Sequence, residues 1–241
     1  CEYAVMEVSS QGIKMHRTDG LYFNYAIFTN ISPDHIGPGE HADFEEYLYY
    51  KTRLLNMCGI GLVNKDDKHA PQIIKAANCE LYTYSEESKE ADFVASDIRY
   101  VSQPDFVGTE FHISGKYDME VRLGIPGLFN VVNALAAVSV CSFLGLDQAR
   151  ISHALENIRV NGRMEIVYTS ERCTVLVDYA HNAVSMESLL STLRDYKPKR
   201  LVCVFGCGGN RSKDRRYSMG EIGGKMADLS IITADNSRYE K

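Results

Sequence analysis

The chain has 241 residues, a length that suits one large domain or two ordinary ones. Hydrophobic residues make up 45% of it and charged residues 24%, the composition of a globular protein, and no apolar run is long enough to span a membrane. The net charge of −6 argues against a general nucleic-acid binder, which usually carries a basic surface, but it leaves room for small anionic ligands held by local basic residues.

The first part of the chain alternates strand-like and helix-like segments. We expect strands over residues 1–10, 25–30 and 59–67, because each contains an apolar run of buried-strand length. Helices are expected over residues 41–55 and 70–78, after the second and third of these strands. Such alternation predicts a parallel sheet covered on both faces, so the predicted fold class is α/β.

Beyond the second predicted helix the pattern changes to short, partly alternating runs separated by Gly, Pro or Asp. These runs are residues 97–103, 108–115 and 117–125. They predict a small antiparallel annex to the sheet. Two further helices are expected, over residues 127–146 and 147–158, and Asp147 is the expected N-cap of the second.

The stretch "VNGRMEIV", residues 160–167, is a predicted domain boundary, which divides the chain into residues 1–159 and 160–241. Alternation resumes after it. The expected elements are a strand over 173–180, a helix over 184–196, a strand over 200–206, a weak helix over 217–229 and a strand over 230–235. This order predicts a second, incomplete doubly wound unit of Rossmann-like type.

The predicted helix over residues 41–55 raises a question. Phe44, Leu48 and Leu55 recur at helical spacing, and Lys51 falls on the same apolar stripe. A largely buried ammonium is costly unless it is paired. One interpretation is that the stem is buried and the charge reaches water, and the other is that the lysine has a chemical function.

Polar residues follow the predicted strands, at the sheet edge where ligands of open parallel sheets bind. Glu7 and Ser9 lie at the end of the first predicted strand, and His35 follows the second. Each of them also fits an ordinary surface or loop residue. The stretch "GCGGN", residues 206–210, resembles a phosphate-binding loop or a tight strand exit. The basic residues after it suit either a solvated loop or the binding of carboxylates. They are Arg211, Lys213, Arg215 and Arg216.

Several stretches together resemble the Mur ligase family, in its order and approximate spacing. They are "MEVSS", "FTNISPDH", "YLYYKTRLL", "GLFNVVNALAA", "NGRMEIV", "VDYAH", "VFGCGGNR" and "DNSR". The resemblance covers nearly the whole chain. It implies that residues 1–159 are the central ATPase domain without its P-loop, and that residues 160–241 are the first part of the C-terminal domain.

The P-loop pattern G-x-x-x-x-G-K-[ST] does not occur in these residues. The chain opens on Cys1 and ends just after a strand-like run, so we expect a piece of a longer protein. In enzymes of this type the P-loop binds the phosphates and contributes much of the affinity for the nucleotide. We therefore expect the 241-residue chain alone to be inactive.

The resemblance implies that Lys51 is carbamylated by CO2, which turns its amine into an anionic oxygen ligand. It implies that Glu7, His35 and the modified Lys51 hold Mg²⁺, a cation that prefers oxygen ligands. It also implies that Lys51 and Arg163 are catalytic, and that ATP is a substrate.

The same resemblance assigns the remaining candidate residues. Ser9 and Arg17 match residues that hold the muramoyl-dipeptide. The residues that match nucleotide contacts are Asn130, Asn133, Arg163 and Asp178. Arg211, Asn236 and Arg238 match residues that grip the incoming amino acid. The expected partners are therefore a UDP-muramoyl-dipeptide and an amino acid, and we expect neither a nucleic-acid partner nor a membrane span.

The implied reaction makes an amide bond in peptidoglycan synthesis. ATP phosphorylates the dipeptide carboxylate, and the amine of the third amino acid, expected to be meso-diaminopimelate, then displaces phosphate. One alternative is another ligase of the superfamily, such as a folylpolyglutamate synthase. A second alternative is a Mur-like partner subunit that does not ligate, although the four-cysteine zinc insert common in such relatives is missing.

Some positions depart from the family's usual motifs. They are Gln11, Met15, Pro33, Asn182, Ala183 and Ser237. None of them replaces a proposed metal ligand, so they affect the expected substrate contacts more than the chemistry. The seven scattered cysteines lack zinc-site spacing and are typical of a reduced, cytoplasmic protein, which we expect to be a monomer.

Overall fold

The computed structural model of the chain describes residues 1–33, 36–37, 39–103, 105–210 and 213–240. The chain forms two compact units. The first consists of Cys1–Asp97, Phe111–Val121 and Val131–Ser152. The second consists of Ile98–Glu110, Arg122–Asn130 and His153–Lys241. The predicted domain boundary at residue 160 stays a prediction.

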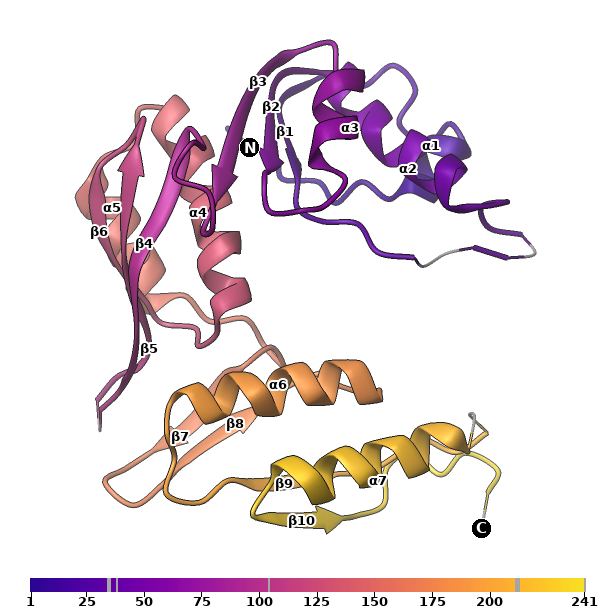
Figure 1. Ribbon diagram of the computed structural model, residues 1–241, viewed down its shortest axis with the longest axis vertical. Coiled ribbons are helices and arrows are strands. Elements are labelled where there is room, and N and C mark those ends of the chain that lie inside the picture. The colour runs from indigo at the N-terminus through magenta and orange to yellow at the C-terminus, as the bar shows by residue number, and fades with distance from the viewer. Residues whose placement is uncertain (34–35, 38, 104, 211–212, 241) are drawn as a thin grey trace. The chain divides into compact units, whose positions relative to one another are not determined.

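A six-stranded sheet has its strands in sequence order (Figure 1). They are β1 (Phe23–Phe28), β2 (Cys58–Asn64), β3 (Glu80–Ser85), β4 (Phe93–Ser102), β5 (Val107–Gly115) and β6 (Met119–Leu123). The pairs β1/β2, β2/β3 and β3/β4 are parallel. Gln103 and Phe106 exchange backbone hydrogen bonds of 2.8 and 3.2 Å between β4 and β5, the pattern of an antiparallel hairpin. This agrees with the predicted annex.

Helices cover β1 and β2 on the face that carries Ala26 and Phe28 (Figure 1). These are α2 (Phe44–Thr52), the 3₁₀ turn η1 (Arg53–Asn56) and α3 (Ala70–Ala76), and α1 (Ser10–Lys14) packs against α2. The Asp43 side chain caps α2 by accepting the Glu46 N–H at 2.8 Å. Leu48 and Leu55 then pack into a core with Phe28. Burial of this face stabilises α2 more than its propensity does.

The opposite face of β1 meets the end of α4 (Leu128–Phe143). Tyr25 alternates with Ala26 along the strand, so its ring points the other way, and it stacks on Phe143 at 6.1 Å between centroids. Phe143 also contacts the ring of Tyr82 on β3. The prediction of a parallel sheet covered on both faces is therefore confirmed for these strands.

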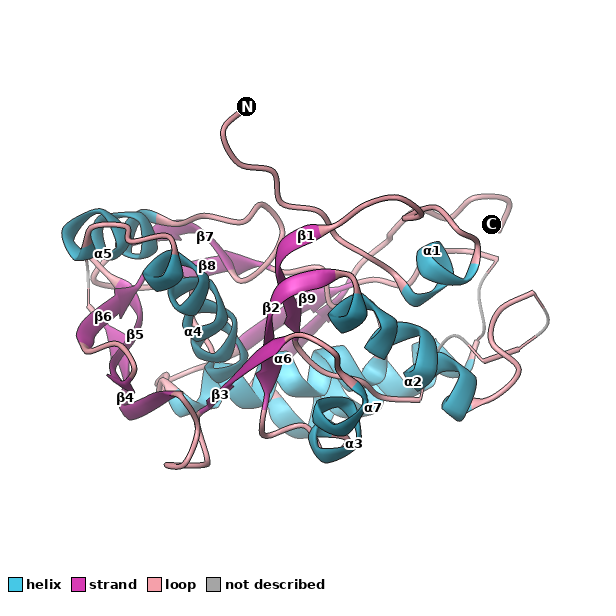
Figure 2. Cartoon of the chain, turned by 90° about the horizontal axis from the view of Figure 1, so that it is seen from above, coloured by secondary structure: helices cyan, strands magenta, loops and turns pink. Residues whose placement is uncertain are grey.

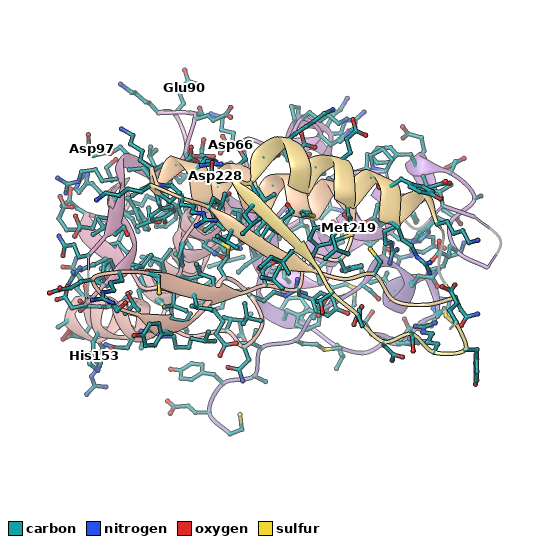
Figure 3. All side chains as sticks on the ribbon, turned by 90° about the horizontal axis from the view of Figure 1, so that it is seen from below. Asp66, Glu90, Asp97, His153, Met219 and Asp228 are labelled. Carbon is teal, nitrogen blue, oxygen red and sulfur yellow. The ribbon has the colours of Figure 1, made fainter. Side chains whose placement is uncertain are left out.

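Two pairs of strands and two helices form the last part of the chain. The strands are β7 (Glu165–Thr169), antiparallel to β8 (Thr174–Val177), and β9 (Val202–Phe205), parallel to β10 (Leu229–Ile232). Helices α6 (Ala183–Asp195) and α7 (Asp214–Met226) lie side by side (Figures 1 and 2). Leu190 of α6 and Met219 of α7 are buried in one core with Leu201. Figure 3 labels Met219.

Helix α5 (Gln148–Asn157) begins where the sequence predicts. Asp147 accepts hydrogen bonds from the N–H groups of Ala149, at 2.6 Å, and Arg150, at 3.4 Å. The prediction that Asp147 is the N-cap is confirmed, because a cap satisfies first-turn N–H groups that have no partner within the helix.

One prediction of local structure is wrong, and two strands were not predicted. A strand was expected over residues 1–10, but residues 1–9 form no regular structure. No described strand pairs with them, and an apolar run alone cannot supply the hydrogen bonds that a strand's backbone needs. The pattern does not predict β3 at all. Strand β7 begins inside the predicted boundary at 160–167, where no strand was expected, and it pairs antiparallel with β8. The parallel pair β9/β10 agrees with the expected doubly wound unit.

Within the part of the chain that the structure describes, each helix is too short or too polar to cross a membrane.

The carboxyl end of β1 is linked to β3 by one buried hydrogen bond. The Tyr84 hydroxyl donates to the Phe28 carbonyl at 3.0 Å, and burial raises the pKa of that hydroxyl, so it stays protonated. Tyr84→Phe should lower the free energy of unfolding by about 1–2 kcal/mol, because the Phe28 carbonyl loses its partner. Urea denaturation should measure the loss. The exposed Tyr22, changed to Phe as a control, should alter stability by less than about 0.5 kcal/mol.

Candidate functional site

Three candidate residues lie before and just after helix α1. Glu7 is exposed in the irregular segment that precedes the helix. The Ser9 side chain caps α1 by accepting the Gly12 N–H at 3.0 Å. Arg17 follows the helix, is exposed, and contacts the Met15 sulfur at 3.6 Å. The proposed dipeptide-binding residues Ser9 and Arg17 are thus both exposed, and Ser9 also stabilises the helix that lies between them.

Lys51 lies on the inner face of α2, with the buried Tyr47 and Leu48. Its side chain is half-buried, and Nζ donates to the Asn30 carbonyl at 3.0 Å, just after β1. Nζ also lies 5.3 Å from the Tyr47 ring centroid and 5.9 Å from that of Phe28. The ammonium therefore contacts protein groups at the end of a parallel strand. A lysine whose charge simply reached water would not make these contacts.

A metal site is not assembled among the residues that the structure describes. No group of three or more His, Cys, Asp or Glu side chains there could hold a metal ion. His35 lies outside the described residues. The proposed set of Glu7, His35 and carbamylated Lys51 has the donor chemistry that Mg²⁺ prefers, two carboxylate-type groups and one imidazole.

Two asparagines were proposed to bind nucleotide at the start of α4. Asn130 is half-buried, and its Nδ2 donates to the Pro126 carbonyl at 2.7 Å, so its side chain helps to fix the first turn. Asn133 is exposed one turn later. Gly127, just before the helix, has a φ of +106°, a conformation that favours glycine and sets how the chain enters α4.

The structure brings Arg163 and Asp178 together. Asp178 follows β8, and its carboxylate accepts the Met164 N–H at 2.9 Å and the Ala180 N–H at 2.8 Å. This ties the segment that carries Arg163 to the end of β8. The exposed guanidinium of Arg163 lies 4.6 Å from the Tyr179 ring centroid. An arginine and a carboxylate at one strand end form a polar patch suited to a phosphorylated or hydroxylated ligand.

The loops after β9 and β10 pack directly on each other. The Gly209 N–H donates to the Asn236 carbonyl at 2.8 Å, and the Tyr239 N–H donates to Asn210 Oδ1 at 3.1 Å. Within the second loop, the Arg238 N–H donates to Asn236 Oδ1 at 3.1 Å. Asn236 and Arg238 are exposed at this junction. Arg211, the third residue proposed to grip the amino acid, lies outside the described residues.

Sequence reasoning missed Glu240, which joins the same two loops. Its carboxylate accepts the Asn210 N–H at 2.9 Å and pairs with Arg216 of α7. The hydrogen bond from Arg216 is the main reason that the pKa of Glu240 lies below its usual value. The sequence offered one indication of this role, because Glu240 places a carboxylate two residues after Arg238.

Sequence reasoning also missed His41, whose side chain is completely buried beside α1 and α2. Its Nε2 lies 2.9 Å from the Ser10 hydroxyl. A histidine two residues before the capping Asp43 was the only local signal, and nothing in the pattern indicates its partner 31 residues away.

Comparison with known proteins gives family matches for both parts of the chain. The Mur ligase middle domain matches residues 1–141, and the Mur ligase glutamate ligase domain matches residues 162–241.

Two curated relatives cover nearly the whole chain. "UDP-N-acetylmuramoyl-L-alanyl-D-glutamate--2,6-diaminopimelate ligase 2" of Clostridium acetobutylicum is 39% identical over 239 residues, 99% of this chain and 48% of the relative. The enzyme of Alkaliphilus oremlandii with the same name, without the final number, is 40% identical over 248 residues, 98% of this chain and 48% of the relative. The chain thus spans about half the length of these relatives.

A solved structure described as "Structure of UDP-N-acetylmuramoyl-L-alanyl-D-glutamate--2, 6-diaminopimelate ligase" has a TM-score of 0.75 to this chain. It is 30% identical, and the match covers 97% of this chain and 48% of that one. The likeness extends over both family regions.

Close packing of the two loops makes Gly209 sensitive to substitution. A Cβ at this position would lie 1.9 Å from the Ser237 carbonyl oxygen, and backbone cannot yield cheaply. Gly209→Ala should lower the free energy of unfolding of the second unit by about 1–3 kcal/mol. Thermal and urea denaturation should reveal the loss. Gly220→Ala on α7 is the matched control, since its Cβ would meet nothing within 4 Å, and it should leave stability unchanged or raise it.

Proposed function

The chain belongs to the Mur ligase family, and on that premise we propose that its protein is an ATP-dependent ligase of peptidoglycan synthesis. The proposed reaction adds the third amino acid to UDP-N-acetylmuramoyl-L-alanyl-D-glutamate. The observation that carries the proposal is the pair of relatives at 39% and 40% identity, both named as 2,6-diaminopimelate ligases. A folylpolyglutamate synthase or a non-ligating partner subunit receives no comparable support.

We propose that meso-diaminopimelate is the amino acid added. It carries a second carboxylate at its far end, which lysine lacks, and a guanidinium can fork onto a carboxylate with two hydrogen bonds. Arg238 is exposed on the loop after β10, which is hydrogen-bonded to the loop after β9. The backbone at Arg238 is therefore fixed, while the side chain is accessible. Asn236 and Arg211 complete the proposed subsite. Ser237 in place of the family's proline should loosen the loop without removing the charge.

The proposed mechanism has two steps. A carboxylate oxygen of the dipeptide attacks the γ-phosphorus of ATP, and ADP leaves. The amine of the amino acid then attacks the acyl carbon, loses a proton, and expels phosphate. The protein's contribution is positioning and charge neutralisation, since no covalent enzyme intermediate is needed.

Residues of the chain take distinct positions in this scheme. Ser9 and Arg17 would hold the muramoyl-dipeptide beside α1. Nucleotide contacts would come from Asn130, Asn133 and Asp178, and Arg163 would contact phosphate and act in catalysis. The proximity of Arg163 and Asp178 supports the last two roles, because the Asp178 carboxylate fixes the backbone beside the arginine.

We also propose that Lys51 is carbamylated, and that Glu7, His35 and the carbamate hold Mg²⁺. When bound, Mg²⁺ would neutralise phosphate charge. The position of Lys51 supports the proposal, because its amine lies at the carboxyl end of β1, the edge of a parallel sheet where ligands bind. ATP and UDP-linked substrates place the proposed enzyme in the cytoplasm, and we propose that it works as a monomer.

The proposed carbamate makes Lys51 testable by chemical rescue. In a protein of full Mur ligase length that contains this chain, Lys51→Ala should abolish ligation, because the anionic oxygens are lost. Small carboxylic acids should partly restore activity by replacing those oxygens. Lys75→Ala, at an exposed position on α3, is the control and should keep full activity. Full activity of Lys51→Ala without added acid would contradict the proposal.

Arg238 tests both the function and the choice of amino acid. The full-length protein should ligate diaminopimelate to the dipeptide and should prefer it to lysine. Arg238→Ala should weaken diaminopimelate ligation by roughly 1.5–3 kcal/mol in kcat/KM, the scale of a hydrogen bond to a charged group. The exposed Arg172, changed to Ala, should leave it unchanged. A wild-type preference for lysine, or an Arg238→Ala variant as active as wild type, would refute the assignment.

A further inference from the structure

His41 is a buried, titratable side chain to which the proposed mechanism gives no part. It is 0% exposed and lies between α1 and the start of α2. Its Nε2 is 2.9 Å from Ser10 Oγ, and its Nδ1 is 3.6 Å from Glu46 Oε2. Its ring packs against those of Tyr47 and Tyr50, at 5.3 and 5.7 Å between centroids. The imidazole therefore connects the first residue of α1 with the first turn of α2.

A second polar link holds the other end of α1. Lys14, in the last turn, donates to Glu46 Oε2 and to the Glu40 carbonyl, both at 2.9 Å. Glu46 also accepts the Ala42 N–H at 2.7 Å. The hydrogen bond from Lys14 is the largest of the causes that lower the pKa of Glu46, so this carboxylate is ionised at neutral pH and holds the Lys14 link to α1.

The order of Ser10, His41 and Glu46 is that of a serine–histidine–carboxylate triad, but this arrangement cannot act as a nucleophile. Ser10 is 3% exposed, so a substrate cannot reach its hydroxyl. The 3.6 Å between His41 and Glu46 is too long for a hydrogen bond that would orient the ring. Buried polar groups that do no chemistry are retained where their hydrogen bonds fix one arrangement of the elements they join.

The two elements that His41 joins carry different parts of the proposed site. Ser9 and Arg17, proposed to hold the dipeptide, flank α1. Lys51 lies near the end of α2, with its amine on the Asn30 carbonyl. A shift of α1 along α2 would move the dipeptide contacts relative to Lys51, and errors of about 1 Å in such positions can cost two orders of magnitude in rate.

We propose that His41 is a positioning residue, which sets the place of the dipeptide-binding segment around α1 against the helix that carries Lys51. This inference rests on the proposed function. It predicts that loss of the imidazole weakens use of the dipeptide far more than the affinity for ATP, because the residues proposed to contact the nucleotide directly lie outside α1 and α2.

The test uses His41→Leu in the full-length protein. The KM for the UDP-muramoyl-dipeptide should rise at least tenfold, while the KM for ATP should stay within twofold of wild type. His41→Gln, whose amide can still reach the Ser10 hydroxyl, should restore much of the loss. His69→Leu is the matched control. His69 also stacks on a ring of α2, Phe44 at 4.8 Å, but it begins α3, and its loss should leave both KM values unchanged.

Calorimetry of dipeptide binding supplies a readout that is independent of turnover. If His41→Leu does not fold, Ser10→Ala removes the same link with a smaller change and should also weaken the dipeptide at least severalfold. A folded variant with unchanged dipeptide KM, or one in which the dipeptide and ATP are weakened equally, would overturn the inference. A wild-type protein that does not ligate the dipeptide would instead overturn the proposed function.

Discussion

The packing of α2 and the following turn η1 against β1 and β2 is the constraint on which the first unit depends. Leu48 of α2 and Leu55 of η1 enter the same core as Phe28, so the helix can neither rotate nor slide without exposing them. Because Lys51 lies on that inner face, its amine is brought to the Asn30 carbonyl rather than released to solvent. The packing of this core therefore fixes the position of Lys51.

Several side chains expected to bind ligands also hold the backbone that presents them. Ser9 caps α1, Asn130 bonds to the Pro126 carbonyl, and Asp178 fixes the backbone beside Arg163. The Asn236 carboxamide shapes the turn at Arg238 in the same way. A structural and a functional interpretation are therefore compatible at these positions, and a substitution there changes geometry together with chemistry.

The errors in predicting the fold have a common physical origin. The run at residues 1–10 has a strand's composition, but strand formation needs a neighbour, and none of the described strands supplies one. Strand β7 lies in a segment that reads as a boundary, because its pairing with β8 is decided across a turn and not within the segment itself. Local pattern predicts a propensity, and pairing decides whether that propensity is realised.

The sequence by itself determined the α/β class, the order of most elements, the cap at Asp147, the buried stripe that includes Lys51, and the resemblance to the Mur ligases. Each of these depends on local spacing or on ordered motifs. Only the tertiary structure decided that His41 meets Ser10, and that Glu240 closes the loops after β9 and β10. Those partners lie 31 and 30 residues apart, and the two contacts arise from helix packing and strand pairing rather than from any local pattern.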